Sequence, residues 1–300
     1  MIMKTKVLIL AVICSISINY SFAQSPSPST APTDSTKKNV VVDSALLAKQ
    51  KNSGLEVKPA KIDFHLTKGE SASQAIYITN NFNKTMQFKA RFSDWMRDSV
   101  GGHAYLEPGT TPRSCAKWMS FANDVVEIEP GKTKEFLIKM KVPDDDSAIQ
   151  QMKWCLVFLE SVKENKVYKP SDSSKAHVNT IFRVGIHVLQ TPPKLAAQKE
   201  LEMISFKSVA GSKNNYQILC RNTGQTELEC KSYIELSELK TGKKTTVGPV
   251  VFPIFPEQRR YTNFTIPPDM EKGKYSVLAV IDAGEDDIPV QASEAIIDVE

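Results

Sequence analysis

The sequence predicts an all-β protein made of two tandem immunoglobulin-like Greek-key β-sandwiches. Three observations support this fold class. Stretches of strand length alternate apolar and polar residues, Gly, Pro, Asn and Asp separate them as turns, and helical periodicity is nearly absent. About seven such strands in each hundred-odd residues is the density expected of a sandwich.

Strands are expected over 56–66, 74–79, 86–95, 136–142 and 151–160 in the first half. The stretch 136–142 places Phe136, Ile138, Met140 and Val142 on one row, which indicates one buried face. The stretch 151–160 is apolar almost throughout, which indicates burial on both faces. A long irregular section is expected between 96 and 125.

The second half repeats the punctuation of the first. Pro130, Pro143-Asp144 and Lys153-Trp154 correspond in order to Pro256, Pro268-Asp269 and Lys274-Tyr275, and the first two landmarks are 13 residues apart in one half and 12 in the other. A repeated supersecondary unit indicates two domains of one kind. We therefore expect an N-terminal domain over 55–192 and a C-terminal domain over 193–300.

The stretch 177–190 predicts one long strand that closes the first domain. Its even row is apolar or β-branched from Val178 to Val188, and the Pro192-Pro193 pair ends the strand, because proline cannot donate to a β-ladder. A polar loop over 160–176 precedes it, so its first half is the part expected to project. We predict that this strand binds a protein partner by edge pairing through Val178, Thr180, Phe182 and Val184.

The N-terminus predicts export. Lys4 and Lys6 precede an apolar run over 7–13, and Ser21-Phe22-Ala23 fits a cleavage site, so residues 1–23 are expected to be a signal peptide. A lipoprotein anchored at Cys14 is the alternative, which the bulky Ile13 disfavours. Residues 24–54 are expected to be a flexible Ser/Pro-rich tail. These features predict a periplasmic protein, with cell-surface exposure as a second possibility and no transmembrane segment.

Four cysteines remain after cleavage, namely Cys115, Cys155, Cys220 and Cys230. An even number in an exported chain favours disulfides over metal ligands. Of the three possible pairings, Cys115 with Cys155 and Cys220 with Cys230 is the simplest, and buried free thiols are the alternative.

Composition and motifs favour a binding protein over an enzyme. The formal net charge of +4 falls to about +2 when Lys4 and Lys6 are removed, which gives no reason to expect nucleic acid as a partner. The four histidines lack metal-ligand spacing, and phosphate-loop and nucleophile-elbow motifs are absent. Neither a cofactor nor a metal is expected.

The order of these features resembles the PapD-like periplasmic chaperones of pilus assembly. The resemblance rests on Ala75 to Asn80, on Val126 to Pro143 with its Pro-Gly turn, and on the strands expected over 151–160 and 177–190. It implies a fimbrial-chaperone-like protein that lends its seventh strand to a client subunit. It also implies a cleft between the domains, where basic residues bind the client's C-terminal carboxylate, and the matching positions are Lys61, His187 and Arg183.

Two other functions remain open at this point. The sandwiches could form a structural or accessory subunit of a cell-envelope complex. The chain also resembles the peptidoglycan-binding WxL-associated surface proteins at Lys117-Trp118-Met119, which implies binding of cell-wall polysaccharide.

Overall fold

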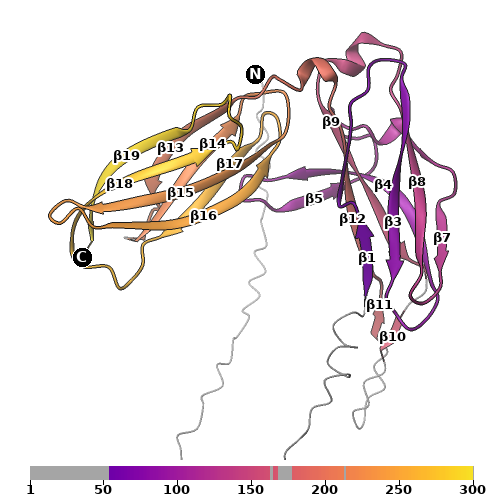
Figure 1. Cartoon of the computed structure of the whole chain (residues 1–300), viewed down its shortest axis with the longest axis horizontal. Helices are drawn as coiled ribbons and strands as arrows, with labels where there is room; N and C mark the ends of the chain where they lie inside the picture. Colours follow the sequence, from indigo (N-terminus) through magenta and orange to yellow (C-terminus); the bar gives the residue numbers. More distant parts are fainter. Residues whose placement is uncertain (1–53, 163–164, 168–177, 213, 300) are drawn as a thin grey trace, which may run out of the picture. The chain divides into compact units, whose positions relative to one another are not determined.

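A computed structural model describes residues 54–162, 165–167, 178–212 and 214–299 (Figure 1). These residues form β-strands joined by turns and three short 3₁₀ segments, η1 (Ala116–Trp118), η2 (Asp146–Ile149) and η3 (Pro193–Leu195). None of them lies in an α-helix, and no helix among them is long and apolar enough to cross a membrane. The all-β prediction is confirmed. The expected signal peptide and most of the expected tail lie outside the described residues.

The strands that precede η3 form two facing sheets and a small hairpin. One sheet has the order β1-β3-β8-β6, the other has the order β2-β12-β9-β4-β5 with β7 also paired to β4, and β10 pairs with β11. The strands are β1 (Leu55–Lys58), β2 (Lys61–Phe64), β3 (Ser71–Asn80), β4 (Met86–Arg97), β5 (His103–Leu106), β6 (Met119–Phe121), β7 (Val125–Ile128), β8 (Thr133–Lys141), β9 (Lys153–Ser161), β10 (Asn165–Val167), β11 (Val178–Thr180) and β12 (Arg183–Gln190).

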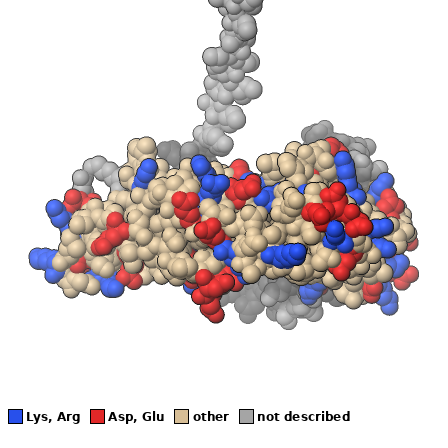
Figure 2. Space-filling model, turned by 90° about the horizontal axis from the view of Figure 1, so that it is seen from above, with Lys and Arg blue, Asp and Glu red and all other residues tan. Residues whose placement is uncertain are grey.

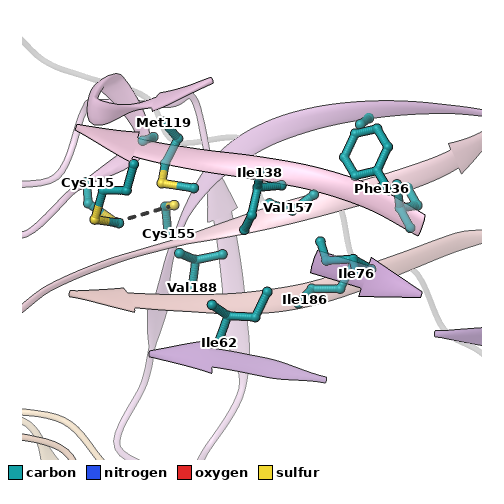
Figure 3. Close-up of a cluster of buried hydrophobic side chains, with 14 of the residues drawn as sticks. Ile62, Ile76, Cys115, Met119, Phe136, Ile138, Cys155, Val157, Ile186 and Val188 are labelled. Carbon is teal, nitrogen blue, oxygen red and sulfur yellow. Dashed lines mark hydrogen bonds between the residues drawn. The ribbon is translucent and has the colours of Figure 1, made fainter. Parts of the chain in front are cut away.

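One apolar core fills the space between these two sheets (Figure 3). The rows predicted from alternation supply it: Ile76 and Ile138 face Val157 and Val188, and all four side chains are fully buried. Strand β9 is buried on its second face as well, because Trp154, Leu156 and Phe158 join a separate cluster with Trp95. The near-continuous apolarity of 151–160 is thereby explained.

The strands that follow η3 form a second pair of sheets, with the orders β13-β14-β17 and β16-β15-β18-β19. Two clusters of buried side chains lie among them, one around Ile234 and Val277 and the other around Cys220 and Cys230. The strands are β13 (Leu201–Ser208), β14 (Asn215–Asn222), β15 (Leu228–Glu238), β16 (Lys244–Ile254), β17 (Arg259–Thr265), β18 (Gly273–Asp282) and β19 (Gln291–Val299).

The two sandwich architectures therefore follow one another along the chain, as predicted. In the described part of the chain, no sheet contains strands from both sides of η3. Contact density nevertheless places all the described residues in one compact unit. The division into domains at 192 and 193 stays a prediction.

Two strand predictions were wrong in the same way. The strand expected over 56–66 is two strands, β1 and β2, which belong to opposite sheets on either side of Pro59. The strand expected over 177–190 is also two, β11 and β12, with a break at Ile181 and Phe182. In both cases the pairing partner changes at the break. The apolar row continues across Ile181 and Phe182, whereas at Pro59 the core-facing residues change from Leu55 and Val57 to Ile62 and Phe64.

Candidate functional site

The predicted partner-binding residues do not lie on one strand. Val178 and Thr180 belong to β11, which pairs with β10, whereas Val184 belongs to β12, which pairs with β9. Phe182 lies at the break between them. Its ring is half-buried against the first core, 5.2 Å from the ring of Phe82 between centroids.

Strand β12 has one edge that is only partly covered. Strand β2 runs parallel to it, but its register begins at His187 opposite Lys61 and ends at Gln190 opposite Phe64. The N–H of His187 donates to the carbonyl of Ala60 at 3.0 Å, so odd-numbered residues of β12 point their backbone groups toward this edge. Arg183 and Gly185 share that orientation, and no described strand pairs with them on this side.

The uncovered edge, Arg183–Ile186, is bordered by half-buried apolar side chains. Leu55 and Val57 of β1 and Phe182 pack against the first core without being fully covered, and Val184 is half-buried. Ile181 beside them is 61% exposed. The edge thus combines unpaired backbone groups with apolar contacts on the core side.

The three predicted carboxylate-binding residues lie on one sheet and have different surroundings. Lys61 and His187 are Cα partners on β2 and β12, so the structure brings these two together. Lys61 Nζ donates to Glu227 Oε2 at 3.0 Å. Burial raises the pKa of Glu227 even though this ammonium lies beside it.

His187 is held neutral by its surroundings. Its ring makes an edge-on contact with Trp95 at 4.7 Å between centroids and lies 6.2 Å from the ring of His103. Burial, followed by the charges of His103, Arg97 and Lys61, lowers the pKa of His187 from 6.5 to about 4. His187 therefore offers a carboxylate a neutral ring at pH 7.

The side chain of Arg183 has its own partners on the neighbouring strand β9. Its guanidinium pairs with Glu160 and lies over the ring of Phe158 at 5.0 Å, while Arg91 approaches the same ring at 5.6 Å. It also stands four residues from His187 along β12, about 13 Å at strand rise. The structure does not bring Arg183 to Lys61.

One cation near His103 and His187, Arg97, was not predicted from the sequence. Arg97 Nη2 lies 2.9 Å from His103 Nε2, and its Nε atom is buried with no hydrogen-bond partner among the described residues. Burial, and then the charge of Arg260, lowers the pKa of Arg97. It was missed because β4 was expected to end at Trp95 and β5, which carries His103, falls in the section expected to be irregular.

The four cysteines are buried free thiols in the structure, which is the alternative to the predicted disulfides. The sulfur atoms of Cys115 and Cys155 lie 3.4 Å apart, within hydrogen-bond reach and beyond a covalent bond (Figure 3). Cys220 on β14 and Cys230 on β15 come from opposite sheets and share one buried cluster. Burial raises the pKa of Cys220 to about 12.

Charge and metal chemistry add no second site. Figure 2 shows acidic and basic side chains mixed over the visible face rather than gathered into one field. Within the described residues, no group of three His, Cys, Asp or Glu side chains is arranged to hold a metal ion.

Comparison with known proteins finds similar solved structures and nothing else. No family model matches, and no curated protein matches. The chain is similar to the class 5 fimbriae chaperone CfaA, with 13% identity, a TM-score of 0.43 and coverage of 81% of this chain and 99% of the other. It is also similar to a structure of the CsuC–CsuE chaperone–tip adhesion subunit complex from Acinetobacter baumannii, with 14% identity, a TM-score of 0.44 and coverage of 81% and 98%.

A protein of unknown function from Porphyromonas gingivalis is similar as well, with 13% identity and a TM-score of 0.28 over 82% of this chain and 99% of the other. These identities and TM-scores assign neither a family nor a function to the chain.

Proposed function

We propose that this chain is a non-catalytic protein-binding module that binds an extended segment of a client protein along the uncovered edge of β12, as a fimbrial chaperone would. The observation that carries the proposal is the register of β2, which leaves Arg183–Ile186 unpaired on one side. Strand addition takes its affinity from such backbone groups and its specificity from pockets for alternate side chains. The half-buried Phe182 and Val184 supply apolar contacts for those side chains.

Val178 and Thr180 would extend the same interface if β11 exchanged β10 for the client. The role of Lys61 in this proposal is narrower than expected from the resemblance, because a client carboxylate would have to compete with Glu227 for its ammonium. We further propose that the chain acts in the periplasm, after removal of residues 1–23.

The edge can be tested with two substitutions at one position. Arg183 is the first residue of β12, where proline is tolerated in strands. Arg183→Pro removes the edge-facing N–H, and Arg183→Ala removes the same ion pair with Glu160 while keeping that N–H. We expect affinity capture from a periplasmic extract to recover a client with the wild type and Arg183→Ala, and at least about tenfold less with Arg183→Pro.

Amide hydrogen exchange provides the fold control and the position of binding. Free protein should exchange Arg183 and Gly185 rapidly and Val184 and Ile186 slowly, and a captured client should slow the first pair. A client retained equally by Arg183→Pro would contradict strand addition at this edge. It would favour a structural or accessory subunit, whose contacts would lie elsewhere.

We also propose that a protein disulfide acting as oxidant joins Cys115 to Cys155: the two thiols give up two protons and two electrons as their S–S bond forms, and the oxidant's disulfide is reduced to two thiols. The thiols are 3.4 Å apart and belong to η1's N-terminal cap and β9, so a small side-chain movement joins them. In the chain-entropy account a loop of this length contributes roughly 4 kcal/mol. Non-reducing peptide mapping of protein from an oxidising compartment checks this, and recovery of both thiols unlinked would reject it.

A further inference from the structure

The side of the first sandwich away from β12 carries a crevice that the proposed function does not use. Strand β12 lies near one end of the sheet order, whereas β7 pairs with β4 at the other, and β8 lies across the sandwich from β7. A crevice of about 500 Å³ opens between two walls: one is Ala122, Asn123 and the β7 residues 125–127, and the other is the β8 residues 134–137. In Figure 1, β7 and β8 lie next to each other on this side.

Both walls of this β7–β8 crevice present unpaired backbone. On β7, the carbonyl of Asp124 accepts from the N–H of Ala90 at 2.6 Å, so the backbone groups of even-numbered residues face β4 and those of Val125 and Glu127 face away from it. The N–H of Val125 donates to Asn123 Oδ1 at 3.1 Å, which leaves its carbonyl and the backbone groups of Glu127 for an occupant. On β8, Lys132 and Val142 bond toward β3, so Glu135 and Leu137 face away from it. Strand β6 pairs only with Ile138–Met140, and no other described strand pairs with β8 on that side.

The side chains of the crevice divide into an apolar floor and a charged rim. Phe136 and Val126 are 5% and 8% exposed and belong to the first core, and Leu137 beside them is 48% exposed. The charged residues that line the crevice are Glu127 and Glu135, against one cation, Lys134. An occupant with an extended main chain, alternating apolar side chains and basic side chains would meet all of these groups.

A second copy of this chain fits poorly here. The antiparallel register that uses all of the uncovered part of β8 pairs Thr133–Leu137 with itself about Glu135. That register opposes Glu135 to Glu135, and like charges directly opposite each other destabilise a strand pair. A basic residue at the same place would pair favourably with it.

We propose that the β7–β8 crevice is a second strand-addition site, which binds an extended apolar-and-basic segment of another protein. It is independent of the β12 edge, because the two lie on different strands and different sides of the sheet order. The chain could then hold two extended segments at once.

The test uses full-length protein and two end-blocked, fluorophore-labelled octapeptides, one alternating valine with lysine and the other alternating valine with glutamate. Fluorescence anisotropy should show the lysine peptide binding at least about fivefold tighter than the glutamate peptide. Glu135→Arg should weaken the lysine peptide about fivefold and strengthen the glutamate peptide. Glu129→Arg is the matched control: it makes the same charge change on an exposed turn outside the crevice lining and should change either affinity less than about twofold.

Hydrogen exchange then assigns the site. The lysine peptide should slow exchange at Glu135 and Leu137. Absence of binding, equal affinity for both peptides, or an unchanged affinity in Glu135→Arg would overturn the proposal. Slower exchange at Arg183 and Gly185 alone would also overturn the crevice proposal, and it would support binding at the β12 edge. Concentration-dependent dimerisation that Glu135→Arg abolishes would assign the crevice to a second copy instead.

Discussion

Asn80, at the end of β3, and Asn222, at the end of β14, hold the same network in the two halves of the chain. Asn80 Nδ2 donates to the carbonyls of Lys84 and Ile128, both at 2.8 Å. Asn222 Nδ2 donates to the carbonyls of Thr226 and Ile254, at 2.8 and 2.9 Å. Both side chains are fully buried, and each side-chain oxygen accepts a backbone N–H two residues on.

The two networks differ at one residue. The backbone of each asparagine also bonds to the turn after a proline, through Gly131 in the first half and Glu257 in the second. Both residues have a φ of +69°, a region that glycine adopts freely and glutamate does not. Glu257 is the single described residue other than glycine with a positive φ, and its carboxylate lies 2.7 Å from the guanidinium of Arg113. The asparagine hydrogen bonds and the left-handed turn are therefore the same in both halves, and only the residue at the left-handed position differs.

The asparagines should matter most. Asn80→Ala and Asn222→Ala each leave two buried carbonyls and one N–H without partners, so we expect each to lower the free energy of unfolding by about 3 kcal/mol. Urea unfolding followed by fluorescence measures this. Asn263→Ala, at an exposed position that accepts only from Gln217, should change it by less than about 0.5 kcal/mol. A lower free energy of unfolding in only one of the two variants would show that the two networks are not equivalent.

A second difference between the halves is their response to acid, because no histidine follows His187 in the sequence. The pKa of His187 is lowered to about 4 in the folded protein, so the unfolded chain binds the proton more readily between pH 6.5 and 4. Stability should therefore fall as pH drops through that window, by roughly 1 kcal/mol after allowance for solvent screening.

The measurement is the difference in unfolding free energy between wild type and His187→Gln at pH 7 and at pH 4. That difference should shrink toward acid pH, and it isolates His187 from acids such as Asp63, whose pKa burial raises. A difference that stays constant across the window would show that His187 is not held neutral.

The turn residues should give the smallest effects, with opposite signs. Gly131→Ala forces a side chain into a left-handed backbone with no atom within 4 Å to clash with, so the cost is that of the backbone alone, about 1 kcal/mol. Glu257→Gly removes the same strain and should stabilise by up to about 1 kcal/mol, less the pair with Arg113. Thermal unfolding of both variants tests the pair, and equal signs would show that the two turns are not equivalent.

The sequence predicts the buried rows well and the pairing of strands poorly. The alternation in β8 and the continuous apolarity of β9 identify core strands, because burial leaves a mark at every second residue or at every residue. The break at Ile181 was missed because the apolar row continues across it while the pairing partner changes. The break at Pro59 was missed although the core-facing residues change there from Leu55 and Val57 to Ile62 and Phe64. Strand β5 was missed for the opposite reason, since all four of its residues are exposed and form no apolar row.

The candidate site follows the same division. The neighbourhood of Lys61 and His187 was predictable by resemblance, because it depends on where two strands run. The uncovered edge at Arg183–Ile186 was not, because it depends on where β2 stops pairing. The lowered pKa values of His187 and Arg97 were not predictable either, because they depend on burial that only the folded chain defines.

The pairing of β2 with β12 also has a consequence for the order in which the chain folds. The pairing begins with Lys61 opposite His187. At its other end the side-chain amide of Gln190 donates to the carbonyl of Leu66 at 2.6 Å and accepts from the N–H of Leu66 at 3.3 Å. Contacts between residues so distant in sequence form slowly, because the intervening loop must close first. When the chain is synthesised from its N-terminus, the first sandwich cannot be completed until Gln190 has been added. For most of that time Ile62 and Phe64 of β2 have no neighbouring strand to pair with. The segment proposed to bind a client is therefore the last strand that the first sandwich acquires for itself.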